Sequence, residues 1–220
     1  MKIEAIIFDL DGTLLNTIDD IADSMNLILS KYGFPPHLAE DYKKFVGDGI
    51  EVLVSRALSP EDRKTEIINN LVDEFKKVYS RNWNVKTKVY DGIEETLSEL
   101  HKMGYKLAIL SNKREDFTKA MVKAMLPNIP FTAVLGLKEG IPPKPHPESA
   151  MRVLKIIGVP PEKCLYVGDS DIDMKCATSS GMIPVGVLWG FRDEKELTQN
   201  GARFLISKPG EIFKILDSYK

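Results

Sequence analysis

The chain begins with a short apolar run at residues 3–8, in which Glu4 is the one polar residue. Runs of this length without strict alternation of apolar and polar residues are typical of strands buried on both faces of a parallel sheet. Asp9 and Asp11 follow directly, and Gly12 and Thr13 can turn the backbone after them. Open α/β sheets carry their chemistry at the carboxyl ends of their strands, so this pair of acids is a candidate for metal binding or covalent catalysis.

Residues 18–82 have a different pattern, in which apolar side chains recur at helical spacing. Amphipathic stripes cover residues 18–32, 50–58 and 67–79. Gly33 is predicted to end the first helix, Asp48 to cap the second, and Pro60 to stand at the first position of the third. We interpret each stripe as core packing and assign no chemistry to it.

After Trp83 the pattern predicts strands that alternate with helices. Strands are expected near residues 106–110, 133–135, 164–167 and 183–187. Such alternation is typical of a doubly wound parallel sheet. The strand at residues 3–8 must join this sheet, so the helical block is an insertion. The predicted fold is therefore α/β, with one domain formed by residues 1–15 and 84–220 and a small helical domain at residues 16–83.

Composition and charge limit the classes of protein to which this chain can belong. The 220 residues carry a formal net charge of −2, which gives no reason to expect binding to nucleic acid or to a membrane surface. No apolar run approaches the ~20 residues of a membrane span, and the chain opens directly into a strand, so we expect a cytoplasmic protein without a signal peptide. Cys164 and Cys176 are too few for a disulfide framework and are interpreted as small buried residues. We expect a monomer or a homodimer.

Acidic, hydroxyl-bearing and lysine side chains recur at or just beyond strand ends. They are Asp9 with Asp11, then Ser111, then Lys144, then Asp169 with Asp173. Oxygen ligands of this kind suit a hard cation such as Mg²⁺. A metal, a lysine and hydroxyl donors together are what a transferring phosphoryl group requires, because its oxygens must be neutralised.

Each of these residues taken alone also has a simpler interpretation. Asp11–Gly12 could serve only as a turn, Ser111–Asn112 could cap the next helix, and Lys144 could be a solvated lysine in a proline-rich loop. Asp173 could merely complement a helix dipole. His146 has no partner acid that the sequence identifies, so we interpret it as structural. The joint occurrence of the set favours function.

The same residues carry a family resemblance. The segments Asp9–Thr13, Ser111–Asn112, Lys144–Pro147 and Gly168–Asp173 resemble, in order, the motifs of the haloacid dehalogenase superfamily. The match spans nearly the whole chain, and the helical insertion after the first motif resembles the first type of cap domain in that superfamily. Residues 45–58 and 187–191 are similar to phosphoglycolate phosphatases. Asn16 departs from the commonest pattern, which has aspartate there, but it is not a reacting group.

The resemblance implies a role for each acid. Asp9 would attack phosphorus and form an aspartyl-phosphate. Asp11 would protonate the leaving oxygen and later take a proton from water. Mg²⁺ would be held by Asp9, the backbone carbonyl of Asp11 and Asp169, while Asp173 would orient metal-bound water or Lys144 from behind.

The resemblance also implies a substrate-binding set. Ser111 and Lys144 would hold the phosphoryl oxygens, with Gly12, Thr13 and Asn112 beside them. The cap would bind the rest of the substrate. Lys43 and Arg56 are the cap cations that we expect to meet a substrate carboxylate, with Lys113 and Arg114 of the core next in line.

The activity implied is that of a Mg²⁺-dependent phosphatase acting on a small phosphorylated metabolite, with 2-phosphoglycolate as the first choice. Pyrophosphate and other short phosphomonoesters stay open. A hexose-phosphate mutase shares the constellation, although it often has an aliphatic residue where Thr13 stands. Asp11 argues against a dehalogenase, which needs no acid or base there. A non-enzymatic phospho-Asp signalling domain would use neither Asp11 nor the insertion.

Overall fold

The chain divides into two compact units in the computed structural model, which describes residues 2–220. An α/β unit is formed by residues 2–15 together with Val89–Lys220, and a helical unit by Asn16–Lys88. The chain passes between them at β2 (Leu15–Asn16) and β3 (Lys88–Val89), which pair as a two-stranded sheet.

The second crossing lies five residues later than the sequence pattern predicts, after residue 88 instead of residue 83. The reason is a buried carboxylate on α1 (Ile18–Lys31). Asp20 accepts hydrogen bonds from the backbone N–H groups of Lys86, at 2.9 Å, and of Thr87, at 2.8 Å. These bonds tie Lys86 and Thr87 to α1 of the helical unit.

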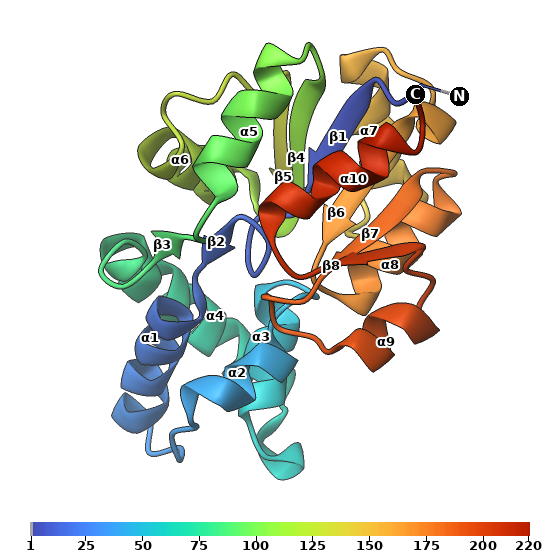
Figure 1. The fold of residues 1–220 in the computed structure, drawn as a ribbon. Coiled ribbons are helices and arrows are strands. Elements are labelled where there is room, and N and C mark those ends of the chain that lie inside the picture. The colour runs from blue at the N-terminus through green and yellow to red at the C-terminus, as the bar shows by residue number, and fades with distance from the viewer. Residues whose placement is uncertain (1) are drawn as a thin grey trace. The chain divides into compact units, whose positions relative to one another are not determined.

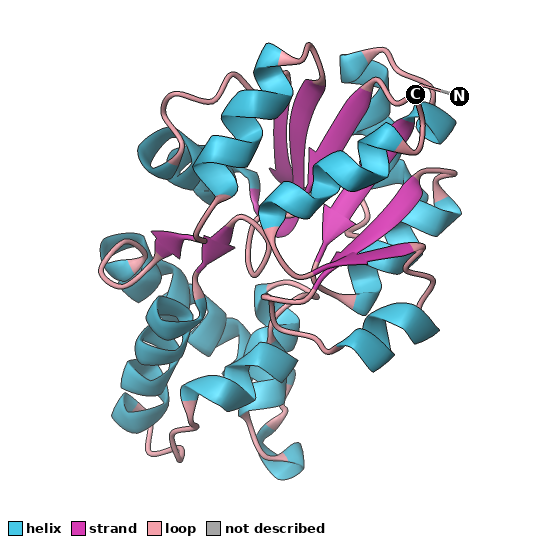
Figure 2. Ribbon diagram, viewed as in Figure 1, coloured by secondary structure: helices cyan, strands magenta, loops and turns pink. Residues whose placement is uncertain are grey.

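The α/β unit contains the parallel sheet that the alternating pattern predicts (Figure 2). Its six strands have the order β5-β4-β1-β6-β7-β8, and every pair is parallel. The strands are β1 (Ala5–Phe8), β4 (Lys106–Arg114), β5 (Ala133–Leu137), β6 (Cys164–Gly168), β7 (Ile183–Val187) and β8 (Phe204–Ile206). The sequence pattern did not predict β8, because three residues are too few to show a period.

Helices cover both faces of this sheet, as a doubly wound fold requires. They are α5 (Ile93–Lys102), α6 (Glu115–Met125), α7 (Pro147–Ile157), α8 (Asp171–Ser179), α9 (Glu194–Gln199) and α10 (Ile212–Asp217), with 3₁₀ turns at Pro161–Lys163 and Pro209–Glu211. Helices α7 and α8 pack with Ala5 and Ile7 of β1 in one buried cluster, while α5 and α10 lie on the opposite face (Figure 1).

Strand β1 occupies the centre of the sheet and therefore brings distant segments together. Phe8, its last residue, is in register with Ile109 of β4 on one side and with Val167 of β6 on the other. The residues that follow these positions leave the sheet at the same edge. Asp9, Ser111 and Asp169 consequently emerge side by side although more than half of the chain separates the first from the last.

The helical unit contains α1, α2 (Ala39–Phe45), α3 (Ile50–Ala57), a 3₁₀ turn at Pro60–Asp62 and α4 (Thr65–Asn82). Three details differ from the sequence pattern. Helix α2 was not predicted, because Tyr42 is its one buried residue and leaves no period. Gly49, not Asp48, caps α3, because the Asp48 side chain pairs with Arg56. The segment at Pro60 forms a separate turn, and α4 begins at Thr65.

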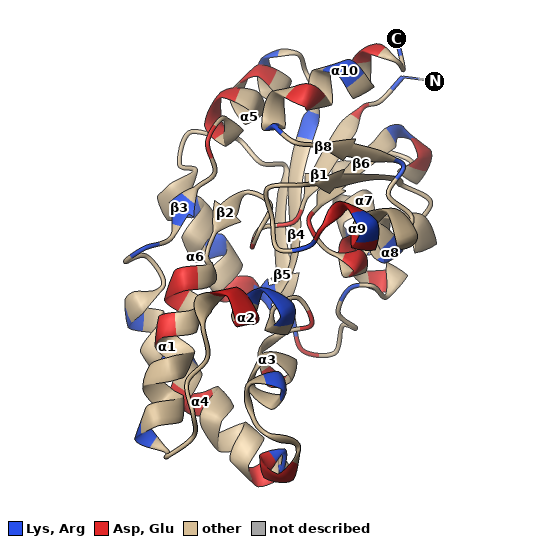
Figure 3. Cartoon of the chain, turned by 60° about the horizontal axis from the view of Figure 1, so that its bottom comes forward, with Lys and Arg blue, Asp and Glu red and all other residues tan. Residues whose placement is uncertain are grey.

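Charged residues of both signs are distributed over the helices, α5 and α10 among them (Figure 3). This mixture accords with the small net charge of −2. Within residues 2–220, no helix combines the length and the apolar character that a membrane span needs.

Candidate active site

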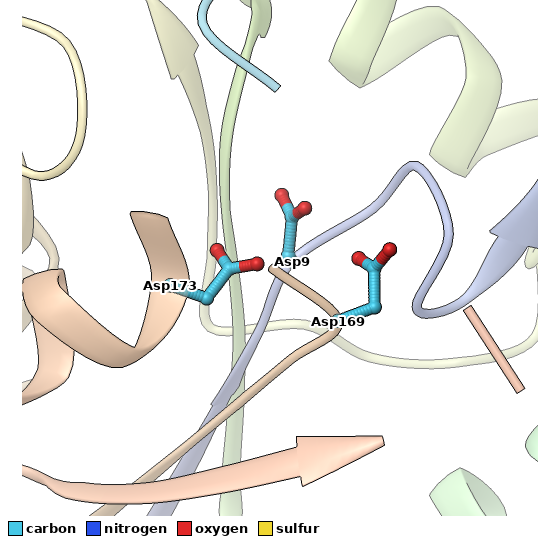
Figure 4. A group of neighbouring side chains, drawn as sticks. All are labelled: Asp9, Asp169 and Asp173. Atoms are coloured by element: carbon cyan, nitrogen blue, oxygen red, sulfur yellow. The ribbon is translucent and has the colours of Figure 1, made fainter. Parts of the chain in front are cut away.

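Three buried carboxylates converge at the carboxyl edge of the sheet (Figure 4). Asp9 follows β1, Asp169 follows β6, and Asp173 lies in the first turn of α8. Each offers an oxygen atom within 4.8 Å of the oxygens of the other two. Like charges at this separation, largely out of contact with water, are stabilised either by a cation among them or by taking up a proton.

Lys144 supplies one such cation. Its Nζ atom lies 2.8 Å from Oδ1 of Asp9 and 2.7 Å from Oδ1 of Asp173, and its side chain is 2% exposed. Burial alone would lower the pKa of the Lys144 ammonium, but the charges of Asp173 and Asp9 raise this pKa well above its ordinary value. This shift favours the charged ammonium, and Lys144 is not a solvated lysine.

The Asn112 side chain fixes the backbone from which Lys144 projects. Its Oδ1 accepts from the N–H of Lys144 at 2.8 Å, and its Nδ2 donates to the carbonyl of Lys144 at 2.9 Å. Neither Asn112 nor Ser111 caps the following helix, because the N-cap of α6 is Arg114 without a side-chain bond. The capping interpretation of this pair is wrong. Ser111 is buried, and its Oγ accepts from the N–H of Lys113 at 3.2 Å.

Asp173 is almost saturated with donors from the protein. Its Oδ2 accepts from the backbone N–H of Ser170 at 3.1 Å and from the Ser170 hydroxyl at 2.6 Å. Its Oδ1 accepts from Lys144, and the Tyr166 hydroxyl lies 3.4 Å away. Asp173 does form a capping box with Ser170 at the start of α8. Its bond to Lys144 is not explained by an interaction with the helix dipole alone.

Asp169 is oriented by groups from the first and the last segment of the site. The Thr13 hydroxyl donates to Oδ1 at 3.0 Å, and the backbone N–H of Phe191 donates to Oδ2 at 2.9 Å. Trp189 Nε1 in turn donates to the carbonyl of Thr13 at 3.0 Å. Burial, followed by the charges of Asp173 and Asp9, raises the pKa of the Asp169 carboxyl well above its ordinary value.

The turn after Asp9 approaches Asp169 so closely that only glycine fits. Gly12 has a φ of +81°, and a Cβ atom on it would lie 2.2 Å from Oδ2 of Asp169. Asp11, one residue earlier, places its Oδ2 3.1 Å from Nζ of Lys113, and both side chains are 11% exposed. The other oxygen of Asp11, Oδ1, is buried and has no hydrogen-bond partner among residues 2–220. A carboxylate with one unpaired oxygen is ready to bond an incoming group.

The pKa of Asp9 shows how burial and neighbouring carboxylates disfavour its negative charge. Burial raises the pKa of its carboxyl to about 7, with Lys144 lowering it and Asp173 and Asp11 raising it. A single buried ammonium therefore does not balance the carboxylates. The site has the composition of one that receives a further cation.

The arrangement can be compared with known proteins. The sequence profile of the haloacid dehalogenase-like hydrolases matches residues 6–187, which include every acid of the site. The chain belongs to this family. It is therefore an enzyme of the hydrolase class.

Relatives of this hydrolase cover it almost completely. A phosphoglycolate phosphatase of Aquifex aeolicus is 32% identical over 214 residues, which is 97% of each chain. A crystal structure of a Lactobacillus delbrueckii subsp. bulgaricus protein superposes with a TM-score of 0.91 at 32% identity and covers 100% of this chain and 99% of its own. That of a predicted phosphoglycolate phosphatase from Haemophilus somnus has a TM-score of 0.90 at 28% identity, with 98% of both chains covered.

Other sequence-predicted residues of the hydrolase have structural contacts. His146 Nδ1 accepts from the N–H of Glu148 at 3.3 Å and caps α7, in agreement with the structural interpretation. Cys164 and Cys176 are buried free thiols. Burial raises the pKa of Cys164 to about 12 and that of Cys176 to about 11, which disfavours the reactive thiolate.

The two cap cations lie in the helical unit and have partners within it. Arg56 pairs with Asp48 at 2.6 Å and donates to the carbonyl of Phe45 at 3.2 Å. Lys43 pairs with Glu40 at 2.8 Å. Arg56 thus braces the loop between α2 and α3, a contact that the sequence pattern did not reveal.

Sequence reasoning missed several contacts that support the site. Tyr166, Ser170 and Trp189 contact Asp173 or the Asp9–Thr13 turn, and Asn112 acts as a clamp on Lys144. Trp189 stands in the segment similar to phosphoglycolate phosphatases, so a signal for it existed. Nothing local in the sequence distinguishes Tyr166, which points inward from the middle of a buried strand.

Proposed function

We propose that this hydrolase is a Mg²⁺-dependent phosphatase that cleaves small phosphomonoesters through an aspartyl-phosphate on Asp9, with 2-phosphoglycolate as substrate. The observation that carries the proposal is the fixed ion triplet of Asp9, Lys144 and Asp173, with Asp11 two residues after the nucleophile. The names of the relatives support 2-phosphoglycolate as the proposed substrate.

The donor set fits a hard divalent cation. Asp9 and Asp169 keep oxygen lone pairs that protein donors do not use. The third proposed ligand is the backbone carbonyl of Asp11, two residues after Asp9. Asp173 has little capacity left, because its oxygens accept from Lys144 and twice from Ser170. We therefore assign Asp9, Asp169 and the Asp11 carbonyl to Mg²⁺ and give Asp173 the role of positioning Lys144. Bound there, Mg²⁺ would neutralise charge on the phosphoryl oxygens and on Asp9.

Asp9 and Asp11 divide the reaction into two displacements. A carboxylate oxygen of Asp9 forms a bond to phosphorus while the bond from phosphorus to the substrate oxygen breaks, and Asp11 gives its proton to that leaving oxygen. In the second step water attacks the phosphorus of the aspartyl-phosphate. Asp11 takes the proton of this water, and the Asp9 carboxylate leaves, so that free phosphate and the original enzyme result.

Ser111, Lys144 and the turn after Asp9 would hold the transferring phosphoryl group. Lys144 is already within hydrogen-bond distance of Asp9 Oδ1, so an oxygen on the phosphorus that Asp9 attacks comes within its reach. The Ser111 hydroxyl and the N–H groups near Gly12 and Asn112 would donate to the remaining oxygens. Thr13 contributes through its bond to Asp169.

The helical unit would act as a cap that reads the rest of the substrate. Lys43 and Arg56 remain the proposed cationic contacts for a carboxylate. Because Arg56 braces the loop beside Asp48, its proposed contribution is to hold the Gly47–Gly49 loop in shape as well as to add charge. We also propose a cytoplasmic protein that is a monomer or a homodimer.

The proposal is tested with purified protein and a panel of phosphorylated metabolites, each assayed for phosphate release with and without Mg²⁺. We expect turnover only with the metal and the largest kcat/KM for 2-phosphoglycolate. Faster release from pyrophosphate would assign the enzyme to pyrophosphate hydrolysis instead. Isomerisation of a hexose phosphate without phosphate release would assign it to the mutases.

A further inference from the structure

Lys113 lies in an irregular segment of β4 that aims it at the site. Leu110 pairs with Leu135 of β5, and Arg114 pairs with Leu137, so three residues of β4 stand opposite the single residue Gly136. Such a bulge bends the strand and redirects the side chains within it. The sequence pattern ended this strand at residue 110 and did not predict the bulge.

The backbone of the bulge is held from both sides. The N–H of Lys113 donates to Ser111 Oγ at 3.2 Å, and the carbonyl of Lys113 accepts from the Thr118 hydroxyl at 3.1 Å. A Cβ atom on Gly136 would lie 2.5 Å from this carbonyl oxygen. The point from which the lysine side chain starts is therefore fixed by packing.

The ammonium of Lys113 lies 3.1 Å from Oδ2 of Asp11, and its side chain is 11% exposed. Lys144 is 2% exposed and contacts Asp9 and Asp173 instead. Lys113 thus brings a second positive charge to the site, and it brings this charge next to the proposed acid.

This position matches the part of the substrate that leaves. A general acid must stand within about 3 Å of the leaving oxygen. In phosphoglycolate that oxygen is attached to a methylene group, which carries the carboxylate. A cation in contact with Asp11 is therefore also within reach of this carboxylate.

We infer that Lys113 binds the carboxylate of the substrate and is a specificity-determining residue of the α/β unit itself. The inference rests on the proposed function of the site and deepens it. A charge-assisted contact to the leaving group would favour phosphoglycolate over esters of similar size that lack the carboxylate. The discrimination then does not depend on the helical unit alone.

The test compares Lys113→Met and Lys113→Arg with the wild type on 2-phosphoglycolate and on ethyl phosphate, which replaces the carboxylate by a methyl group. Lys119→Met is the matched control, because Lys119 also pairs with a carboxylate, Glu115, but on the outside of α6. We expect Lys113→Met to reduce the ratio of kcat/KM for phosphoglycolate to that for ethyl phosphate about 10- to 100-fold, mainly through KM. Arginine should restore part of this ratio, and the control should leave it unchanged.

A binding measurement separates this inference from the proposed function. The dissociation constant of 2-phosphoglycolate is measured by calorimetry on Asp9→Asn and on Asp9→Asn with Lys113→Met, after melting curves show that both variants are folded. Binding at least about tenfold weaker in the double variant supports the inference even if turnover favours another ester. Equal binding, together with an unchanged kcat/KM ratio, would overturn it and restrict Lys113 to holding Asp11.

Discussion

Each carboxylate of the site has its own partners, and the partners decide what its loss does. Asp9 is paired with Lys144, whereas Asp11 is paired with Lys113 and has one buried oxygen without a hydrogen-bond partner among residues 2–220. The two acids are close in sequence but differ in surroundings. That difference is what a nucleophile and an acid–base group require.

We expect Asp9→Asn to abolish turnover of every substrate, because a neutral amide does not attack phosphorus. Asp11→Asn should lose about 10²–10⁴-fold on alkyl phosphates but much less in the phosphorylation of Asp9 by an aryl phosphate, whose leaving group needs little protonation. Burst measurements with both substrate types check this. Equal losses on the two types would remove Asp11 from the acid role.

Replacing Asp169 and Asp173 by alanine should affect different properties, metal affinity in the first case and stability in the second. Asp169→Ala removes a proposed metal ligand and should weaken Mg²⁺ binding strongly. Asp173→Ala leaves the buried Lys144 with one partner fewer and should cost about 3 kcal/mol of unfolding free energy. Metal titration and denaturant unfolding of both variants test this assignment. A larger loss of metal affinity in Asp173→Ala would exchange the two roles.

At the scale of elements, the parts that could be predicted are those with strong local signals. Helix α7 begins at Pro147 and ends before Gly158, as proline and glycine at these positions indicate. Strands β6 and β7 are apolar throughout and appear where expected. Short elements such as α2 and β8 bury too few residues to leave a pattern, so composition alone could not reveal them.

The supporting contacts of the site were hidden for a different reason. The motifs placed Asp9, Ser111, Lys144 and Asp169 on neighbouring strand ends, because parallel topology brings such ends together. The clamp of Asn112 on Lys144 joins residues 32 positions apart and depends on where two loops meet. Sequence periodicity contains no information on such pairs.

The segment at residues 84–88, which leads into β3, provides a prediction at the scale of elements. Asp20→Ala removes the carboxylate that accepts from the N–H groups of Lys86 and Thr87, so these amides should exchange with solvent at least about tenfold faster. Hydrogen exchange measured on peptides covering residues 84–88 checks this. Asp23→Ala is the control, since Asp23 contacts only the Lys86 side chain among the bonds described for it. Similar exchange in both variants would show that Asp20 does not hold residues 84–88 in place.

For the molecule as a whole, the raised pKa of Asp9, about 7, links stability to pH and to metal. A folded-state pKa above the unfolded value of about 3.9 means that the folded protein binds the extra proton. This contribution is fully present below pH 4 and is lost as pH rises through 7. If Mg²⁺ binds at Asp9 as proposed, the cation would take the place of the proton at higher pH.

We therefore expect Mg²⁺ to raise the melting temperature more at pH 8 than at pH 5.5, by about 3 °C or more. Thermal melts in chelator and in excess Mg²⁺ at the two pH values measure this difference. Asp9→Asn, which has no proton to exchange at this position, should show a smaller dependence on pH in chelator. An equal effect of Mg²⁺ at both pH values would place the metal away from Asp9.

The central position of β1 has a consequence for how the protein is made. This strand leaves the ribosome well before its neighbours, because β4 and β6 begin only at Lys106 and Cys164. At about 5–20 residues per second, the apolar strand stays without its partners for several seconds and has an unpaired edge during that time. The helical unit, which spans Asn16–Lys88 as one compact part of the chain, has been synthesised before then. Nascent chains stopped before residue 106 should therefore be the ones that bind chaperones through their N-terminal residues.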